Sequence, residues 1–301
     1  MVTAHSAPQP DRDAMAVLVV GADGVIGSRL ARVLADTGRS VIGTTRRATE
    51  SAADRIHLDL ASADGFDALP LCRAAVLCAA VTSMEYCQKD PEATRQINVT
   101  NTVRLARHLL AAGSHVVFLS SNTVFDGRQP WARATDSTSP RTEYGRQKAD
   151  AESQLLSLGG QITVVRFSKI IPPEMPLLQG WVRDMRSGRS IYPFSDSQMS
   201  PVSLSFAVEL LRRVLEMHAT GIIQASAASD ISYEQAARYL ARRLGCDEQL
   251  IEPISCAQRG IEYSPANTTL DPTRLAAFGL EVPQCTSVLD ALAFSDCDAA
   301  L

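Results

Sequence analysis

The chain has 301 residues, enough for one large hydrophobic core or for a domain with a smaller lobe built onto it. Its 46% hydrophobic and 21% charged residues are typical of a globular protein and exclude collagen, a coiled coil or a disordered chain. The formal charge of -4, from 29 basic and 33 acidic residues, gives no reason to propose a nucleic-acid partner or an anionic-membrane surface.

The cysteine pattern and the first residues bear on the compartment. Seven cysteines, without a C-x-x-C pair, argue against a disulfide framework or a zinc finger and favour a reduced, intracellular compartment. Residues 1–13 lack a basic start and an apolar stretch, so we expect a flexible polar tail rather than a signal peptide. No segment approaches the roughly 18 apolar residues of a membrane span. We therefore expect a cytoplasmic protein, and the scattered histidines predict no metal site.

Residues 14–170 alternate short apolar runs with segments of helical periodicity. The predicted strands are residues 16–20, 40–44, 55–58, 75–79, 115–120 and 161–167. Helices are predicted after the first strand, with Gly38 placed to cap the end, and at residues 91–112 and 142–158. Strict alternation with short connections predicts an α/β fold with a doubly wound parallel sheet.

The pattern changes after residue 171. Residues 171–176 are rich in proline, and residues 192–201 are typical of a loop. Helical patterns return at residues 204–217 and 233–244, with a short strand at residues 221–225 between them. We expect residues 171–301 to form a smaller, substrate-binding lobe, parts of which can return to pack on the first sheet.

A glycine-rich turn follows the first predicted strand and precedes an amphipathic helix. The first glycine allows a tight turn, the second lets backbone N–H groups approach a pyrophosphate, and the third lets the helix pack on the strand. The helix N-terminus adds partial positive charge. A plain turn would contain the same residues, but this position favours a dinucleotide site in a Rossmann-type sheet. The predicted cradle consists of Gly21, Asp23, Gly24, Val25, Ile26 and Gly27.

The end of the second predicted strand selects the dinucleotide. An NAD site places an acid there, whereas this chain has Arg46 and Arg47. Two guanidinium groups suit a 2′-phosphate, so the sequence favours NADP(H) over NAD, although a solvated arginine pair is the alternative. Asp59 and Leu60, after the third strand, are placed to meet the adenine, and a surface cap explains them equally well.

Tyr144 and Lys148 are four residues apart at the start of a predicted helix, so they share one face. A neighbouring ammonium favours the phenolate and is expected to lower the pKa of the tyrosine toward a range useful for acid catalysis. Lys148 is one of only three lysines, with Lys89 and Lys169. The alternative is a surface tyrosine and lysine on an amphipathic helix.

Four polar residues, Ser120, Ser121, Asn122 and Thr123, follow the fifth predicted strand. Ligands of open α/β sheets bind at this carboxyl edge, where a hydroxyl could hydrogen-bond a substrate carbonyl. All four compete for that role, and turn-forming residues would look the same. Lys169, after the sixth strand, lies near the predicted substrate cleft.

These motifs occur in an order that resembles the extended short-chain dehydrogenases/reductases, and within them the dTDP-4-dehydrorhamnose reductase branch. The resemblance uses the glycine turn, Asn98 with Val99, the Ser-Ser-x-x-Val-Phe-Asp-Gly segment from Ser120, and Tyr-Gly-x-x-Lys. It covers nearly the whole chain, because residues 135–140, 200–203, 221–226 and 264–271 also match.

The resemblance implies roles for individual residues. Ser121 would bind the substrate carbonyl, Tyr144 would be the general acid, Lys148 would tune it, and Asn98 would support a proton-relay water. The implied coenzyme contacts are the three glycines, Arg46 or Arg47, Asp59, Lys148, Cys78, Ala79 and Ala80.

Two segments depart from the pattern of this branch, residues 81–87 and 168–172, and both would face the substrate. Trp181, with Arg183, Arg186 and Arg189, could stack on a base and bind a diphosphate, although an ordinary helix with a solvated basic face is the alternative. The candidate substrate-binding residues are Thr82, Glu85, Ser121, Asn122, Thr123, Lys169 and Trp181.

The leading hypothesis is an NADPH-dependent reductase of a keto group on a nucleotide-activated sugar, with Tyr144 as the acid. The alternatives are a sugar-nucleotide epimerase or dehydratase that keeps NAD bound, and a non-catalytic, NADP-binding regulatory subunit. The resemblance also implies a homodimer through residues 91–112 and 142–158. Leu105, Leu109 and Leu110 could equally pack on the sheet of their own subunit.

Overall fold

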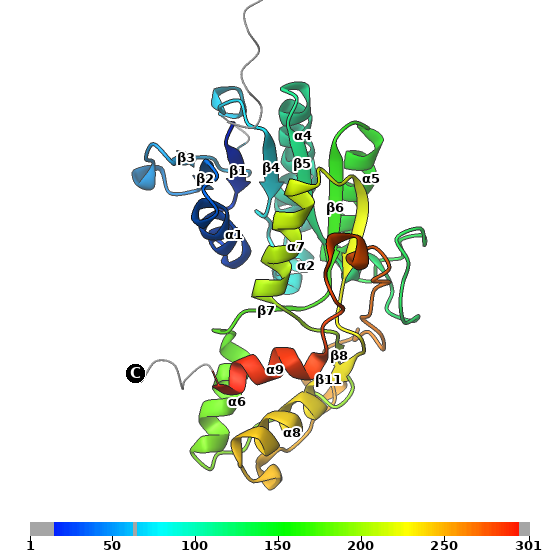
Figure 1. Cartoon of the computed structure of the whole chain (residues 1–301). Helices are drawn as coiled ribbons and strands as arrows, with labels where there is room; N and C mark the ends of the chain where they lie inside the picture. Colours follow the sequence, from blue (N-terminus) through cyan, green and yellow to red (C-terminus); the bar gives the residue numbers. More distant parts are fainter. Residues whose placement is uncertain (1–14, 63–64, 295–301) are drawn as a thin grey trace, which may run out of the picture.

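The larger part of the protein is a parallel β-sheet between layers of helices (Figure 1). The computed structural model describes residues 15–62 and 65–294, so the predicted tail at residues 1–13 lies outside it. Within the described residues the sheet has seven strands in the order β10-β6-β5-β4-β1-β2-β3, all parallel. They are β1 (Val17–Val20), β2 (Val41–Thr45), β3 (Arg55–His57), β4 (Ala74–Leu77), β5 (His115–Ser121), β6 (Ile162–Phe167) and β10 (Gly221–Ala225). The predicted doubly wound α/β fold is confirmed.

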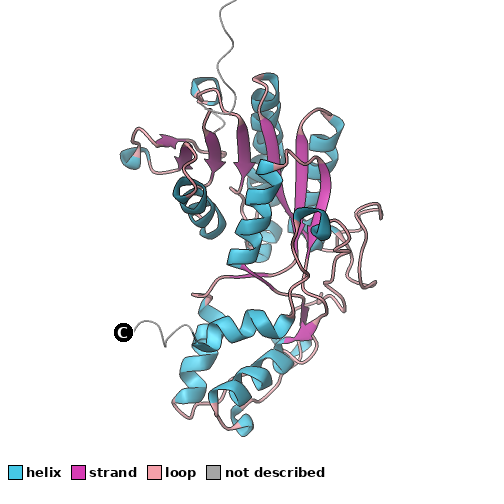
Figure 2. Ribbon diagram, viewed as in Figure 1, coloured by secondary structure: helices cyan, strands magenta, loops and turns pink. Residues whose placement is uncertain are grey.

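Helices cover both faces of this sheet (Figure 2). The helices next to it are α1 (Val25–Asp36), α2 (Met84–Lys89), α3 (Pro91–Arg95), α4 (Thr102–Ala111), α5 (Glu143–Ser157) and α7 (Leu204–Glu216). Side chains alternate along each strand, so Val19 of β1 packs in the cluster with α1 and α7, and Leu18 packs in the cluster with α4 and α5. Both strand residues are fully buried, as expected for a parallel sheet covered on two faces.

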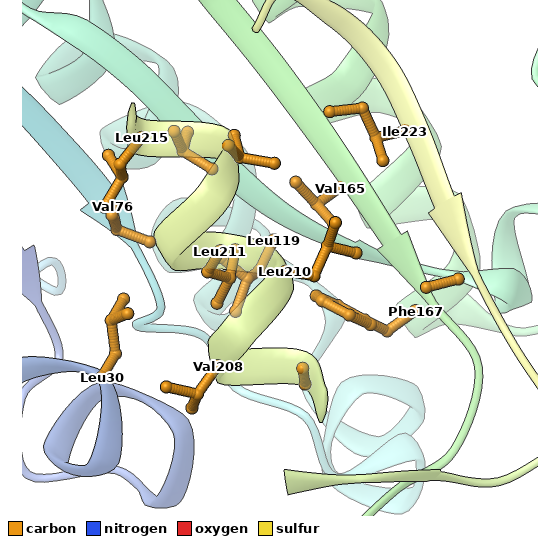
Figure 3. Close-up of a cluster of buried hydrophobic side chains, with 14 of the residues drawn as sticks. Leu30, Val76, Leu119, Val165, Phe167, Val208, Leu210, Leu211, Leu215 and Ile223 are labelled. Carbon is orange, nitrogen blue, oxygen red and sulfur yellow. The ribbon is translucent and has the colours of Figure 1, made fainter. Parts of the chain in front are cut away.

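Helix α7 is held to the sheet by aliphatic packing (Figure 3). Val208, Leu211 and Leu215 of α7 are buried in one cluster with Leu119 of β5 and Val165 of β6. Burying such a side chain contributes about 1.5–3 kcal/mol. The second half of the chain therefore returns to the first sheet, with α7 on its face and β10 beside β6.

The remaining elements form a smaller lobe at one end of the sheet (Figure 1). Its helices are α6 (Pro176–Arg186), α8 (Tyr233–Leu244) and α9 (Cys285–Phe294). Two short strand pairs, β7 (Ile170–Ile171) with β9 (Val202–Ser203) and β8 (Gln198–Met199) with β11 (Ile231–Ser232), connect it to the rest. Leu178, Trp181, Leu240 and Leu289 are buried in its core. Short 3-10 turns lie at Ala48–Glu50, Phe66–Ala68, Asn122–Val124, Glu248–Leu250, Ala257–Arg259 and Leu275–Phe278.

The predicted continuous helix at residues 91–112 is wrong in one respect. It is divided into α3, a π-helical turn at Gln96–Asn101, and α4. In this wider turn, the Thr102 hydroxyl donates a hydrogen bond to the Ile97 backbone carbonyl at 2.7 Å. Because π turns cluster at functional sites, this irregularity points to the surroundings of Asn98.

A buried ion pair joins α5 to the sheet. Arg166 of β6 donates to both carboxylate oxygens of Glu152, at 2.6 to 3.1 Å, and each side chain is only 3% exposed. Arg166 also donates to Gln224 of β10 at 3.0 Å, and Gln224 donates to the Ala132 carbonyl at 2.7 Å. Since every partner is satisfied, the network determines where α5 lies along the sheet.

The leucines considered for a dimer interface are largely used within the subunit. Leu105 and Leu109 of α4 are buried in the cluster between α4, α5 and the sheet, and Leu110 is half-buried. The predicted homodimer therefore stays a prediction that depends on the family resemblance.

Glycine 145 should be required for the close approach of α5 to the end of β5. A Cβ on Gly145 would lie 2.3 Å from the Thr123 carbonyl oxygen, whereas one on Gly180 of α6 would meet only Arg183, at 3.8 Å. We expect Gly145→Ala to lower the free energy of unfolding by about 2 kcal/mol, because the contact is with backbone. The control Gly180→Ala should raise it by about 0.5–1 kcal/mol. Urea denaturation measures both, and a G145A variant as stable as the wild type would contradict the packing argument.

Candidate active site

The turn after β1 has no room for side chains at two of its glycines, Gly21 and Gly27. Gly21 has a φ of +86°, and a Cβ there would lie 2.8 Å from the backbone nitrogen of Ala79, beyond the end of β4. A Cβ on Gly27 would lie 2.3 Å from the Gly21 carbonyl oxygen. The Gly21 N–H donates to the Thr44 hydroxyl of β2 at 3.0 Å. The turn therefore packs tightly between β2 and the end of β4, as a dinucleotide cradle requires.

The start of α1 can accept an anion. Gly24 is the N-cap, and no side chain caps the first turn, which contains Val25 and Ile26. The aliphatic side chain of Val25 is 56% exposed in this turn. Backbone N–H groups at a helix N-terminus are suited to phosphate. The predicted residues of this turn thus fit the pyrophosphate of a dinucleotide.

The loop after β4 forms the facing side of the cradle. The backbone N–H groups of Cys78 and Ala79 both donate to the Val20 carbonyl, at 2.9 Å, which fixes the loop to the end of β1. Cys78, Ala79 and Ala80 are half-buried. Burial raises the pKa of the Cys78 thiol to about 12, so this cysteine is neutral.

The arginines after β2 are accessible. Arg46 is exposed and makes no ion pair with any residue that the structure describes, whereas exposed Arg47 donates to Glu50 at 2.8 Å. Asp23 is bound by the Thr45 hydroxyl at 2.7 Å and by Arg55 at 2.8 Å. Sequence analysis missed Arg55, although its register beside Gly43 in the β2–β3 pair brings it to the same edge. Arg46 therefore has the freest guanidinium for a 2′-phosphate.

The structure corrects the prediction for Leu60. Its side chain is 5% exposed and belongs to the hydrophobic core, and its carbonyl accepts a hydrogen bond from Asn101 at 2.6 Å. Leu60 is thus a core residue rather than a contact surface for adenine. The Asp59 carboxylate accepts the Ala61 N–H at 2.9 Å and closes a turn, in line with the cap alternative.

Tyr144 and Lys148 lie in the first turns of α5, which Thr142 caps through the Gly145 N–H at 3.1 Å. Both side chains are buried, at 9% and 3% exposure. The Lys148 ammonium donates to the Leu119 carbonyl at 2.9 Å. It lies 4.5 Å from the ring centre of Phe118 and 5.8 Å from that of Tyr144. The predicted pair is therefore brought together at the carboxyl end of β5.

The expected lowering of the tyrosine pKa is wrong. Burial raises the pKa of Tyr144, and nearby Cys87 raises it further. The Lys148 ammonium donates to the Leu119 carbonyl and does not offset this rise in the pKa of Tyr144. Burial lowers the pKa of Lys148 to about 8, partly opposed by Glu152 one turn later. Near neutral pH the side chain of Tyr144 is thus a phenol and that of Lys148 an ammonium. Of the two pKa values, that of Lys148 lies closer to neutral pH.

The hydroxyls after β5 differ in their surroundings. Ser121 is half-buried and donates to Asn122 at 3.3 Å while it accepts the Thr123 N–H at 3.2 Å. The Ser120 and Thr123 hydroxyl oxygens are buried and find no hydrogen-bond partner among the described residues. Ser121 and Asn122 therefore remain accessible candidates for a substrate carbonyl, beside two hydroxyls that lack partners.

Asn98 lies in the π-helical turn and is 1% exposed. Its side-chain N–H groups donate to the Val81 carbonyl at 2.9 Å and to Gln147 at 2.8 Å, and its oxygen accepts the Val81 N–H at 2.8 Å. The amide is thus bound to the backbone of Val81 and to Gln147, and the implied support of a relay water stays a prediction. Sequence analysis missed Gln147, which is fully buried.

The substrate-side candidates do not share one environment. Thr82 and Glu85 are exposed at the start of α2, and Lys169 is exposed after β6, although surrounding protein lowers its pKa. Trp181 corrects a prediction, because it is 7% exposed and packs edge-to-face with Tyr233 at 6.2 Å in the core of the small lobe. Its ring is therefore unavailable for stacking on a base.

The described residues contain neither a membrane-spanning helix nor a metal-binding cluster of side chains. They contain no helix long and apolar enough to cross a membrane, and no group of three or more histidines, cysteines or acids that could hold a metal. A cavity of about 250 Å³ between α1, α7 and α9 is lined by Arg29, Glu174 and Ser203 among others, and by none of the predicted catalytic residues.

Comparison with known proteins adds the family. A family model described as the RmlD substrate binding domain matches residues 15–293. Methionine adenosyltransferase 2 subunit beta of Pongo abelii is 24% identical over 285 residues, which cover 88% of this chain and 82% of that protein. A dTDP-4-dehydrorhamnose reductase of Mycobacterium tuberculosis is 25% identical over 256 residues, or 80% of each chain.

A solved structure matches the whole fold. The crystal structure of dTDP-4-dehydrorhamnose reductase from Bacillus anthracis str. Ames in complex with NADP has a TM-score of 0.83 and 18% identity, and the match covers 93% of this chain and 99% of that one. The family model extends over almost every described residue, including both lobes. The chain therefore belongs to the RmlD substrate-binding-domain family, among the extended short-chain dehydrogenases/reductases.

Proposed function

We propose that this protein is an NADPH-dependent reductase of a keto group on a nucleotide-activated sugar. The observation that carries the proposal is the buried Tyr144–Lys148 pair at the carboxyl edge of a sheet whose glycine turn fits a dinucleotide. The reductase of Mycobacterium tuberculosis and the NADP complex of the Bacillus anthracis reductase support it. NADP(H) is the expected coenzyme because exposed Arg46, rather than an acid, follows β2.

When bound, NADPH supplies the hydride that reduces the keto carbon. Tyr144 donates a proton to the substrate oxygen, and its raised pKa keeps the phenol protonated until that step. The Ser121 hydroxyl donates a hydrogen bond to the same oxygen as negative charge develops. Lys148 then stabilises the phenolate when its ammonium leaves the Leu119 carbonyl.

One specific observation favours a second candidate. A protein named as a subunit of methionine adenosyltransferase matches 88% of this chain, so a non-catalytic, NADP-binding regulatory subunit is the alternative. An epimerase or dehydratase with tightly held NAD is less well supported, because the residues directly after β2 are Arg46 and Arg47 rather than an acid. We also propose that the protein is a homodimer, because the resemblance to the family implies one.

Replacing the tyrosine tests the reductase. We expect Tyr144→Phe to lower kcat for NADPH oxidation, with keto sugar nucleotides as substrates, by on the order of 100-fold or more, because the proton donor is lost. Its Kd for NADPH, measured by fluorescence, should stay within about threefold of the wild-type value. Exposed Tyr192 offers the matched control Tyr192→Phe, which should leave both unchanged.

Each outcome separates the candidates. A wild-type protein that oxidises no NADPH with any keto sugar nucleotide, yet co-purifies with a stoichiometric protein partner, would support the regulatory subunit. Tightly bound NAD in the purified protein would support the epimerase or dehydratase. A Y144F variant with unchanged kcat would contradict the assigned acid.

Coenzyme choice should depend on Arg46. Since a charge-assisted hydrogen bond is worth about 1.5–3 kcal/mol, Arg46→Ala should raise the Kd of NADPH by about tenfold or more and leave that of NADH unchanged. The control Arg47→Ala should have a smaller effect, because Arg47 is paired with Glu50. Equal effects of R46A on both coenzymes, in fluorescence titrations, would show that Arg46 does not bind the 2′-phosphate.

Lys148 is expected to contribute to catalysis and, because its ammonium is buried, to lower the free energy of unfolding. Its pKa of about 8 in the folded protein lies below the 10.5 of an unperturbed lysine. The buried ammonium therefore destabilises the folded state below pH 8, and this penalty disappears as the pH rises from about 8 to 10.5. We expect inactive Lys148→Met to be more stable than the coenzyme-free wild type at pH 7, by on the order of 1 kcal/mol after loss of the Leu119 hydrogen bond.

Denaturation at several pH values measures this effect. The advantage of K148M should shrink as the pH rises above 8, and exposed Lys89→Met is the matched control for replacing a lysine by methionine at the surface. A K148M advantage that is absent, or constant from pH 7 to 10, would contradict the assigned burial penalty.

A further inference from the structure

The buried side chain of Gln147 lies on α5 between Tyr144 and Lys148 and connects α5 to two other segments, α3 and the π-helical turn. Its side-chain nitrogen donates to the Thr94 hydroxyl at 2.9 Å and to Glu143 at 3.1 Å, and it lies 3.3 Å from the Pro91 carbonyl. Its oxygen accepts from Asn98 at 2.8 Å. Gln147 is 0% exposed, so water cannot replace these partners.

The partners of the Gln147 nitrogen determine which way its amide points. A carboxylate and a backbone carbonyl only accept hydrogen bonds. The Thr94 hydroxyl donates its proton to the Asp90 carbonyl at 2.8 Å, so it too accepts from Gln147. The amide nitrogen must therefore face Thr94, Pro91 and Glu143, and the amide oxygen must face Asn98.

The orientation of the Gln147 amide determines the orientation of the Asn98 amide. Because the Gln147 oxygen is an acceptor, the nitrogen of Asn98 must face it, and the same nitrogen donates to the Val81 carbonyl. The Asn98 oxygen is then left to accept the Val81 N–H. A reversed amide would place oxygen against oxygen and nitrogen against nitrogen in a buried site.

Val81 immediately follows the Cys78–Ala79–Ala80 turn that packs on Gly21. We propose that Gln147 is a positioning residue, which acts through Asn98 to hold the β4–α2 loop of the coenzyme cradle in a fixed relation to Tyr144 and Lys148. The inference rests on the proposed function, since it assumes that this loop faces NADPH. It assigns a role to the third residue after the tyrosine, which no sequence motif singled out.

The variant Gln147→Glu keeps the size of the side chain and removes both donors. At pH 8 a carboxylate would oppose Glu143 and the Pro91 carbonyl, so the loop should lose its anchor. We expect the Kd of NADPH, measured by fluorescence, to rise about tenfold or more. Below the pKa of the new carboxyl, the protonated form can donate again, so the defect should diminish toward pH 5.5. Among the described residues, other titratable groups beside this chain of amides include Cys87 on α2 and Tyr144 and Lys148 on α5.

Three further variants separate positioning from a general loss of structure. The exchange Glu143→Gln with Gln147→Glu restores a donor opposite the carboxylate and keeps the net charge, so at pH 8 the Kd of NADPH should return to within about threefold of the wild-type value. Gln147→Met cannot titrate, and its weakened binding should be the same at every pH. Exposed Gln154→Glu, on the same helix, adds the same charge and should have no effect.

The readout is independent of turnover. Wild-type affinity for NADPH in Q147M or Q147E across pH 5.5–8 would overturn the proposal, and so would a folded exchange variant without recovery. If Q147E does not fold, the exchange variant and Q147M decide the question. Should the wild type bind NADPH but reduce no keto sugar nucleotide, the proposed function fails while the effects on NADPH binding still test the role of Gln147.

Discussion

The burial of one positive charge governs the arrangement of this site. The Lys148 ammonium lies under the sheet edge against the Leu119 carbonyl and the Phe118 ring, and burial lowers its pKa to about 8. An isolated buried ammonium would be too costly to keep, so the helix that contains it must be fixed at the right depth. The close contact of Gly145 with the Thr123 carbonyl fixes α5 before the lysine, and the Glu152–Arg166 pair fixes it one turn after.

The same constraint explains why polar groups are concentrated on one helix. Glu152 raises the pKa of Lys148, while Arg166 satisfies the carboxylate and is itself held by Gln224 of β10. Strand β10 comes from the second half of the chain, so this edge of the sheet and α5 share one hydrogen-bonded network.

Sequence reasoning predicted the features that depend on local pattern. Continuous apolar runs identified the strands, and the four-residue spacing identified Tyr144 and Lys148. Features that depend on partners from distant segments were missed or wrong: the π turn around Asn98, the burial of Trp181 against Tyr233, and the contacts of Gln147. A buried glutamine and an exposed one look the same in a sequence, because only tertiary packing decides which partners they meet.

The β4–α2 loop is constrained at both of its ends. Ala79 lies against Gly21, where even one added carbon would collide, and two residues later both backbone groups of Val81 are bound by Asn98. The first constraint is steric and belongs to the nucleotide cradle, whereas the second is polar and originates on the helix of Tyr144. These contacts bind the loop both to the glycine turn and to the helix of Tyr144, so in the reductase that we propose they would help hold the hydride donor and the proton donor in one geometry.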